Sequence, residues 1–122
     1  MGDFKDLRVY QLSYKLAMEV FKITTKFPKE ERYSLTDQIR RSSRSIVANL
    51  AEAYRKRQYP KHFLSKLSDS DAELAETLVW LDFSKDCAYI SSDENSYFIK
   101  EYTEVGRLLG GMINKPDKFI IS

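Results

Sequence analysis

Apolar residues recur at steps of three and four along four stretches of this 122-residue chain, the spacing that places them on one face of an α-helix. A proline or a polar loop follows each stretch. The pattern predicts helices over about residues 7–26, 34–57, 61–87 and 93–114. Since no stretch alternates with the period of a strand, we predict an all-α, antiparallel up-down-up-down four-helix bundle that occupies residues 1–122 as a single domain.

The first helix carries two apolar stripes side by side. The main stripe is Val9, Leu12, Leu16, Val20, Ile23 and Phe27. The second stripe is Tyr10, Tyr14, Ala17 and Phe21. Together they form a face wider than one packing seam. Either this helix contacts two neighbours inside the bundle, or another subunit covers part of it.

Single residues depart from the simple pattern at four further places. Ser34 precedes the second helix as a typical N-cap. Asp71 falls on the leucine seam of the third helix, so it must be paired, hydrogen-bonded or at a splayed edge. Gly106 and Gly110 share one face of the fourth helix and each costs about 1 kcal/mol relative to alanine, which predicts close approach of another helix. The apolar tail at residues 119–121 docks either on the bundle or on a neighbour.

The composition is that of an ordinary globular protein, with 43% hydrophobic and 31% charged residues. The single cysteine, Cys87, excludes an internal disulfide, and with His62 as the single histidine a zinc site is not expected. We interpret His62 as a surface residue at a helix start and Cys87 as half-buried near a helix end. No apolar run is long enough to span a membrane and no secretory signal is evident, which predicts a soluble, cytoplasmic protein.

Charge is distributed unevenly although the net charge is only +2. Residues 38–66 contain eight Lys or Arg against one acid, a local charge of +7. Residues 67–105 contain ten Asp or Glu against two lysines, a local charge of −8. One basic and one acidic surface suit nucleic-acid binding, and they suit head-to-tail self-association equally.

The basic segment is the main candidate for a binding site. Its cations alternate with Tyr54 and Tyr59, a combination suited to phosphate contact and base stacking. The alternative is a solvated face, or pairing with the acidic third helix of a neighbouring copy. The candidate nucleic-acid-binding residues are Arg40, Arg41, Arg44, Arg55, Lys56, Arg57 and Lys61, with Lys66 at the end of the segment.

A line of polar residues borders the apolar face of the second helix. With Glu73 of the third helix, this line forms either a small polar site or, as we favour, a buried hydrogen-bond network that sets helix register. Two carboxylates could act as acid and base, but no histidine, cysteine cluster or glycine-rich loop accompanies them. We therefore predict no enzyme, no cofactor, no metal and no small-molecule substrate. The network residues are Gln38, Ser45, Asn49, Glu52 and Glu73.

Several motifs in order along the chain resemble the four-helix bundle proteins of the 23S rRNA intervening-sequence family. The most specific are Gln38-Ile39-Arg40-Arg41 and Ser45-Ile46-Val47-Ala48-Asn49-Leu50-Ala51-Glu52. Others are Phe4-Lys5-Asp6-Leu7, Val9-Tyr10-Gln11, Phe27-Pro28-Lys29-Glu30-Glu31, Tyr33-Ser34-Leu35, Ala72-Glu73-Leu74 and Gly106-Arg107-Leu108-Leu109. The chain is also similar to accessory bundle proteins of diversity-generating retroelements. The resemblance implies a homopentamer associated with nucleic acid and implies no reaction.

Three residues depart from the family pattern. Ala53 stands where the family usually has glycine, and Asp69 and Asp71 stand where glycine and leucine are usual. The two aspartates add negative charge near any nucleic-acid surface on the third helix. Our expectation is a non-enzymatic oligomeric scaffold that binds RNA or DNA. The alternative is a protein-interaction scaffold whose charged faces serve self-assembly.

Overall fold

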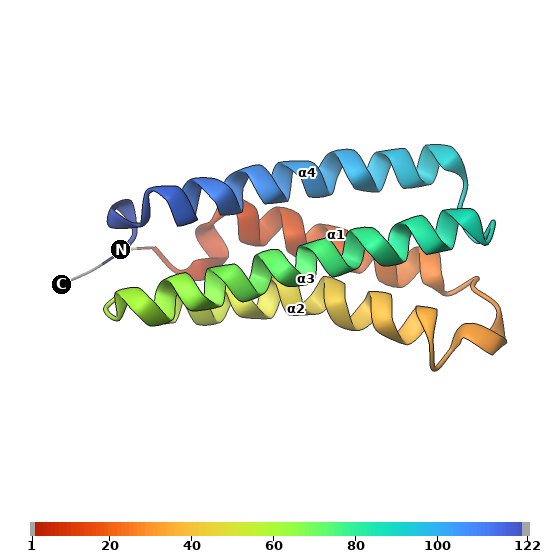
Figure 1. The fold of residues 1–122 in the computed structure, drawn as a ribbon, viewed down its shortest axis with the longest axis horizontal. Helices are drawn as coiled ribbons and strands as arrows, with labels where there is room; N and C mark the ends of the chain where they lie inside the picture. Colours follow the sequence, from red (N-terminus) through yellow and green to blue (C-terminus); the bar gives the residue numbers. More distant parts are fainter. Residues whose placement is uncertain (1, 121–122) are drawn as a thin grey trace.

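The structure is a computed structural model that describes residues 2–120. It contains four long helices: α1 (Arg8–Thr24), α2 (Leu35–Arg55), α3 (Pro60–Asp86) and α4 (Ser92–Asn114) (Figure 1). Three 3-10 turns, η1 (Phe4–Asp6), η2 (Lys29–Glu31) and η3 (Pro116–Lys118), lie before α1, before α2 and after α4. The predicted all-α class is confirmed, and the helices begin and end close to the predicted residues.

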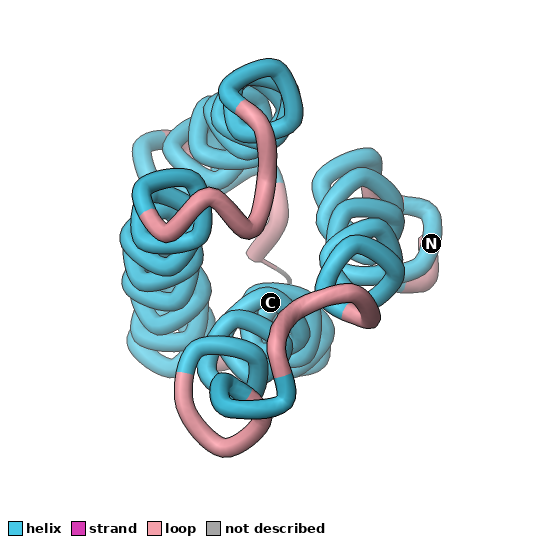
Figure 2. Tube along the Cα trace, turned by 90° about the vertical axis from the view of Figure 1, so that its right-hand side faces the viewer, coloured by secondary structure: helices cyan, strands magenta, loops and turns pink. Residues whose placement is uncertain are grey.

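The helices run alternately up and down, and they surround a common centre when viewed nearly along their length (Figures 1 and 2). Each helix packs against the next in sequence, and α1 packs against α4. The most extensive contact joins α2 and α3. The first turn of α1, the α2–α3 turn and the end of α4 therefore lie at one end of the bundle, as up-down topology requires.

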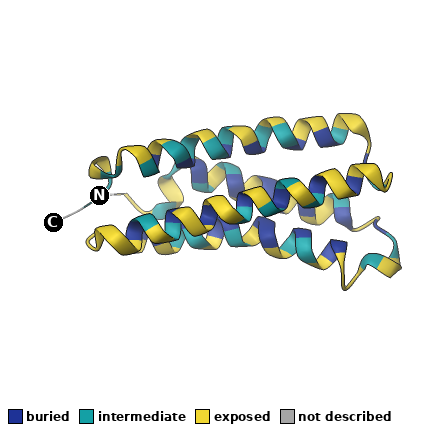
Figure 3. Ribbon diagram, viewed as in Figure 1, coloured by how far each residue is buried: buried dark blue, intermediate teal, exposed yellow. Residues whose placement is uncertain are grey.

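The core is a continuous apolar cluster along the inner faces of all four helices (Figure 3). Its largest fully buried side chains are Phe63 and Tyr102, followed by leucine, isoleucine and valine residues. Of the tail predicted to dock, Phe119 and Ile120 pack half-buried against this cluster. Ile121 lies outside the described residues.

Small hydroxyl residues fill the close contact between α2 and α3. Thr77 Oγ1 donates to Ser42 Oγ at 2.8 Å, and Ser70 Oγ donates to the Ile46 carbonyl at 2.8 Å. Asp71 is exposed, because Ser70 occupies the buried position beside it. The prediction that Asp71 falls on the leucine seam is therefore wrong, since Ser70 takes the buried position. A serine satisfies its own hydrogen bond in this narrow interface without burying a charge.

The two glycines predicted to permit close helix packing differ in whether another helix approaches them. A Cβ added at Gly106 would meet Leu74 Cδ2 of α3 at 3.3 Å, so close approach is confirmed there. A Cβ added at Gly110 would meet no atom within 4 Å, so the prediction is wrong for Gly110. Gly110 faces open space, while its neighbour Leu109 is buried in the core.

The start of α2 is capped by Glu31 and not by the side chain of Ser34. Ser34 occupies the N-cap position, but its hydroxyl donates to Glu31 Oε1 at 2.6 Å, and the same oxygen accepts the Leu35 N–H at 3.4 Å. Tyr89 donates to the other carboxylate oxygen at 2.8 Å. The hydrogen bonds from Ser34 and Tyr89 lower the pKa of Glu31, and the same contact raises the pKa of Tyr89 to about 12.

Candidate nucleic-acid interface

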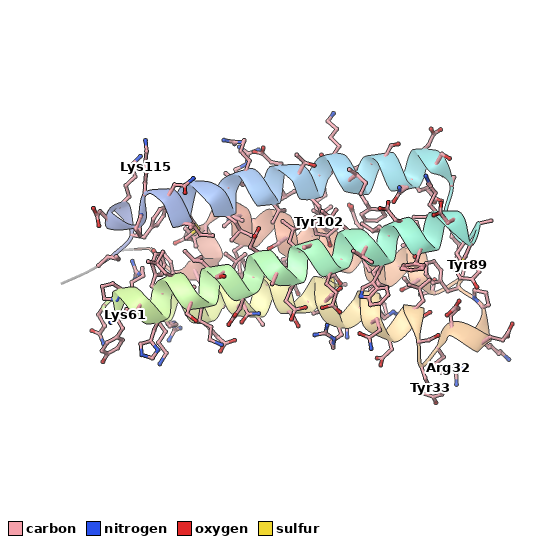
Figure 4. All side chains as sticks on the ribbon, viewed as in Figure 1. Arg32, Tyr33, Lys61, Tyr89, Tyr102 and Lys115 are labelled. Atoms are coloured by element: carbon pink, nitrogen blue, oxygen red, sulfur yellow. The ribbon has the colours of Figure 1, made fainter. Side chains whose placement is uncertain are left out.

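Three segments that are distant in sequence bring cations to one end of the bundle. They are the start of α1 with η1, the α2–α3 turn, and the end of α4 with η3 (Figure 1). Figure 4 shows Lys61 and Lys115 at this shared end. The ring centres of Phe63 and Phe119 lie 6.3 Å apart and join the start of α3 to η3. We call this surface the basic end; its cations are Lys5, Arg8, Arg55, Lys56, Arg57, Lys61, Lys115 and Lys118.

Most cations of the basic end stand without an acidic partner. Among residues 2–120, Arg8 is the one member paired with a carboxylate, that of Glu104 at 3.3 Å. The nearby carboxylates of Asp3 and Asp6 are engaged in capping the η1 turn. Unpaired, solvated cations attract phosphate without first breaking an ion pair, so this end can accept a polyanion.

Aromatic rings position two of these arginines. The Arg55 guanidinium lies 5.5 Å from the centre of the Phe4 ring, and the Arg57 guanidinium lies 3.6 Å from that of Tyr54. Arg57 Nε also donates to the Tyr54 carbonyl at 2.8 Å. A cation held over a ring keeps its charge but loses conformational freedom, which lowers the entropic cost of binding an anion.

Two other predicted cations lie on the side of the bundle between α1 and α2. Arg40 and Arg44 both face Phe21, with guanidinium-to-ring-centre distances of 4.6 and 5.7 Å. Arg40 Nε donates to Thr24 Oγ1 at 2.8 Å, and its Nη2 donates to the Phe21 carbonyl at 3.4 Å. Because α1 ends at Thr24, Arg40 also complements the negative end of that helix.

The remaining two predicted cations are paired with acids. Arg41 contacts Glu76 at 2.5 Å and Glu73 at 3.3 Å, and Lys66 contacts Glu52 at 3.4 Å. The hydrogen bond from Arg41 lowers the pKa of Glu76. The predicted basic group is therefore not one surface. It divides into three groups: the cations of the basic end, Arg40 and Arg44 beside α1, and the ion pairs between α2 and α3.

The five predicted network residues do not form one hydrogen-bonded network within the described chain. Asn49 Nδ2 donates to the Ser45 carbonyl of its own helix at 2.9 Å. Glu52 and Glu73 bind cations as described above, and Gln38 lines a surface cavity beside α3. This correction has a simple cause: the polar line follows the half-exposed border of α2, where long cationic side chains reach its carboxylates. The buried α2–α3 hydrogen bonds come from the shorter hydroxyl residues.

An apolar groove runs along the α1–α2 side. Tyr14 and Met18 are 52% and 44% exposed, and Phe21 is 37% exposed. These three side chains form part of the second stripe on α1 or lie beside it. A cavity of about 430 Å³ lies between this stripe and α2, with Arg44 at its edge. We call this surface the α1–α2 groove; no helix of the described chain covers it.

Residues suited to chemical catalysis are dispersed. His62 is exposed in the first turn of α3, as predicted. Cys87 is exposed at the end of α3, so the prediction that it is half-buried is wrong. No group of three metal-ligating side chains occurs within residues 2–120. None of the helices described combines the length and apolar character needed to cross a bilayer.

Four members of the basic end were missed by sequence reasoning: Lys5, Arg8, Lys115 and Lys118. They lie outside the charged segment at residues 38–66, with α1 between it and the N-terminal pair and α4 between it and the C-terminal pair. The up-down topology could have revealed them, because it brings the start of the first helix, the second turn and the end of the fourth helix together.

Comparisons with known proteins point in one direction. A family model described as 23S rRNA-intervening sequence protein matches residues 5–111. The fold is similar to a crystal structure from Bacteroides thetaiotaomicron, a protein of unknown function from the S23 ribosomal protein family. The two sequences are 28% identical, the match covers 87% of this chain and 95% of that chain, and the TM-score is 0.79. No curated protein matches the chain.

Proposed function

This chain belongs to the 23S rRNA-intervening sequence protein family, and on that premise we propose that it is a non-enzymatic oligomeric scaffold that binds nucleic acid through its basic end. One observation carries the proposal: cations from three separate segments gather there, and all but one lack an acidic partner among residues 2–120. Release of counterions from the phosphate backbone drives association with such a surface.

The aromatic side chains at this end favour single strands. Tyr59 is 50% exposed beside the α2–α3 turn, and the centre of its ring lies 6.0 Å from that of His62. An exposed ring next to lysines offers a stacking platform for an unpaired base, and stacking contributes roughly 1–3 kcal/mol per base. We therefore expect unpaired RNA or DNA to bind more tightly than a duplex.

The α1–α2 groove supports a second role, self-assembly. Three large exposed apolar side chains on one helix face are more than scattered surface residues, and such a face marks an interaction site. The family resemblance of the sequence implies a homopentamer. In an assembled ring the basic ends are repeated, so a modest affinity for phosphate at each copy is raised by avidity.

The proposal is tested by electrophoretic mobility shift with a ribosomal RNA fragment and with unrelated single-stranded and duplex DNA, at 50 and 300 mM salt. We expect binding to all three at low salt, preference for unpaired strands, and a steep loss at high salt. Absence of a shift at 50 mM salt contradicts nucleic-acid binding. Light scattering on the same samples measures assembly separately.

A further inference from the structure

A cavity of about 500 Å³ borders the basic end, between the start of α1 and the end of α4. Its floor is apolar and comes from both helices and from η3. The floor residues are Leu7, Val9, Leu108, Met112 and Phe119. This size falls within the range of cavities that bind small molecules, and an apolar floor with polar groups at one edge is the usual composition of such sites.

The rim of the cavity is cationic. Arg8 and Arg107 both contact the carboxylate of Glu104, at 3.3 and 2.7 Å, so one acid is shared by two cations. The hydrogen bond from Arg107 lowers the pKa of Glu104, which stays ionised at neutral pH. Lys115 and Lys118 also line the cavity, and neither has a carboxylate partner among residues 2–120. The four cations that line the cavity outnumber Glu104 and the exposed Asp117 of η3, so the rim keeps an excess of positive charge for an anion.

A glycine leaves the cavity wall open. Gly111 lines the cavity, and a Cβ added there would meet no atom within 4 Å. Glycine inside a helix costs about 1 kcal/mol relative to alanine, and no close helix contact among residues 2–120 offsets that cost. A side chain at this position would project into the space that a ligand could fill. The neighbouring Gly110 is equally free of contacts but does not line the cavity.

We propose that this cavity binds one nucleoside phosphate, free or at the end of a strand, with the base on the apolar floor and the phosphate at Lys115 and Lys118. Phe119 supplies an aromatic side chain on the floor. The unpaired cations of the basic end continue from the rim, so the rest of a strand could follow them. This inference rests on the proposed nucleic-acid binding and identifies the chemical unit that is recognised.

The test compares two glycine variants. Gly111→Leu fills the cavity, and Gly110→Leu makes the same change one residue away. The probes are adenosine monophosphate, followed by amide chemical shifts, and a fluorescent ten-nucleotide single-stranded RNA, followed by anisotropy. In the wild-type chain we expect the monophosphate to shift the amides of the cavity-lining residues. Gly111→Leu abolishes these shifts and weakens RNA binding about tenfold, as expected for loss of one bound base, while Gly110→Leu changes neither.

We expect both variants to fold, because leucine favours a helix more than glycine does. Circular dichroism checks their helix content. A duplex of the same sequence separates the two proposals. If wild type binds the RNA and Gly111→Leu binds it equally well, the cavity proposal is overturned and general nucleic-acid binding stands. If neither single strand nor duplex binds wild type, the proposed function fails as well. Cavity shifts produced by decanoate but not by the monophosphate would also overturn the nucleoside assignment.

Discussion

The basic end and the α1–α2 side both contain arginines from α2 or from the turn that follows it, but the surroundings of those arginines differ. At the basic end, Arg55 and Arg57 lie over rings at the edge of a surface with few acids. On the α1–α2 side, Arg40 and Arg44 face Phe21, and Arg40 is bound to the end of α1. The first pair extends a cationic surface, and the second pair borders an exposed apolar one.

This difference shows why a count of charges along a helix does not locate a binding surface. What matters is whether each cation has a partner and which other segments lie beside it. The basic end gains four cations from the two ends of the described chain. The α1–α2 groove gains aromatic area from α1. We therefore propose nucleic-acid contact for the first region and assembly for the second.

Charge reversal at the basic end has the largest expected effect. The triple variant Lys56→Glu, Lys61→Glu, Lys115→Glu removes two cations near the α2–α3 turn and one at the end of α4. It leaves the arginines that lie over aromatic rings in place. We expect affinity for single-stranded RNA at 50 mM salt to fall about 100-fold or more, because each change removes a phosphate contact and adds repulsion. Fluorescence anisotropy measures the loss.

A matched triple variant carries the same change of net charge elsewhere. Lys29, Lys85 and Lys100 lie in η2, near the end of α3 and in α4, away from the basic end. Replacing them with glutamate is expected to lower affinity by about threefold or less, since their charges are farther than a Debye length from bound phosphate. Equal losses in the two triples would show that only net charge matters and would break the comparison.

A smaller effect is expected when the α1–α2 groove is made polar. Tyr14→Lys with Met18→Lys places two charges in the exposed apolar stripe, so copies of the 14.3 kDa chain should separate. Light scattering is expected to report the monomer mass, with helix content unchanged. RNA affinity should fall about tenfold through lost avidity alone.

The control for this variant is Tyr33→Lys. Tyr33 is 85% exposed between η2 and α2, so it is the most exposed large apolar side chain outside the groove. Its replacement should leave the mass unchanged. A groove variant that keeps the wild-type mass, or a wild-type protein that is already monomeric, contradicts the assembly role.

The smallest effect is expected at Arg41, which lies on α2 and is already paired with Glu73 and Glu76 of α3. Because the folded-state pKa of Glu76 is lowered, the unfolded chain binds a proton first as the pH falls. The stability from this pair is therefore present above about pH 4.5, the ordinary pKa of glutamate, and is lost as the pH falls through the folded-state value. Arg41→Ala should lower the free energy of unfolding by roughly 0.5–1 kcal/mol at pH 7 and by much less at pH 3.

Urea titration followed by the fluorescence of Trp80 measures this pH dependence, because Trp80 Nε1 donates to Glu76 Oε1 at 3.1 Å. RNA affinity of Arg41→Ala should stay within about twofold of wild type, whereas loss of a free cation would reduce it more. An Arg41 variant that binds RNA as weakly as the triple variant at the basic end would show that Arg41 contacts phosphate despite its acidic partners.

The helices could be predicted from sequence because apolar spacing and proline positions act locally. Pro28 and Pro116 follow helix ends in the structure as they do in the pattern. The buried member of the Ser70–Asp71 pair could not be predicted, because a shift of one residue moves a side chain by about 100° around a helix. Which of two adjacent polar residues is buried depends on the width of the α2–α3 contact.

The site was predicted less completely than the fold. Local charge identified the α2–α3 turn correctly as a cationic segment, but ion pairs such as Arg41–Glu73 depend on neighbours from another helix. The contribution of Lys115 depends on how four helices close on one another. Local sequence therefore identifies candidate charges, and tertiary contacts decide which of them remain free.

The central claim, that the basic end and not the α1–α2 side contacts phosphate, is tested most directly by the salt dependence of RNA affinity. Each phosphate contact with a single strand adds about −0.7 to the slope of log K against log salt. Lys56→Gln with Lys61→Gln should make the slope per chain shallower by about 1.4, and Arg40→Gln with Arg44→Gln should leave it unchanged. A shallower slope for the Arg40 and Arg44 variant, with an unchanged slope for the Lys56 and Lys61 variant, would contradict the assignment.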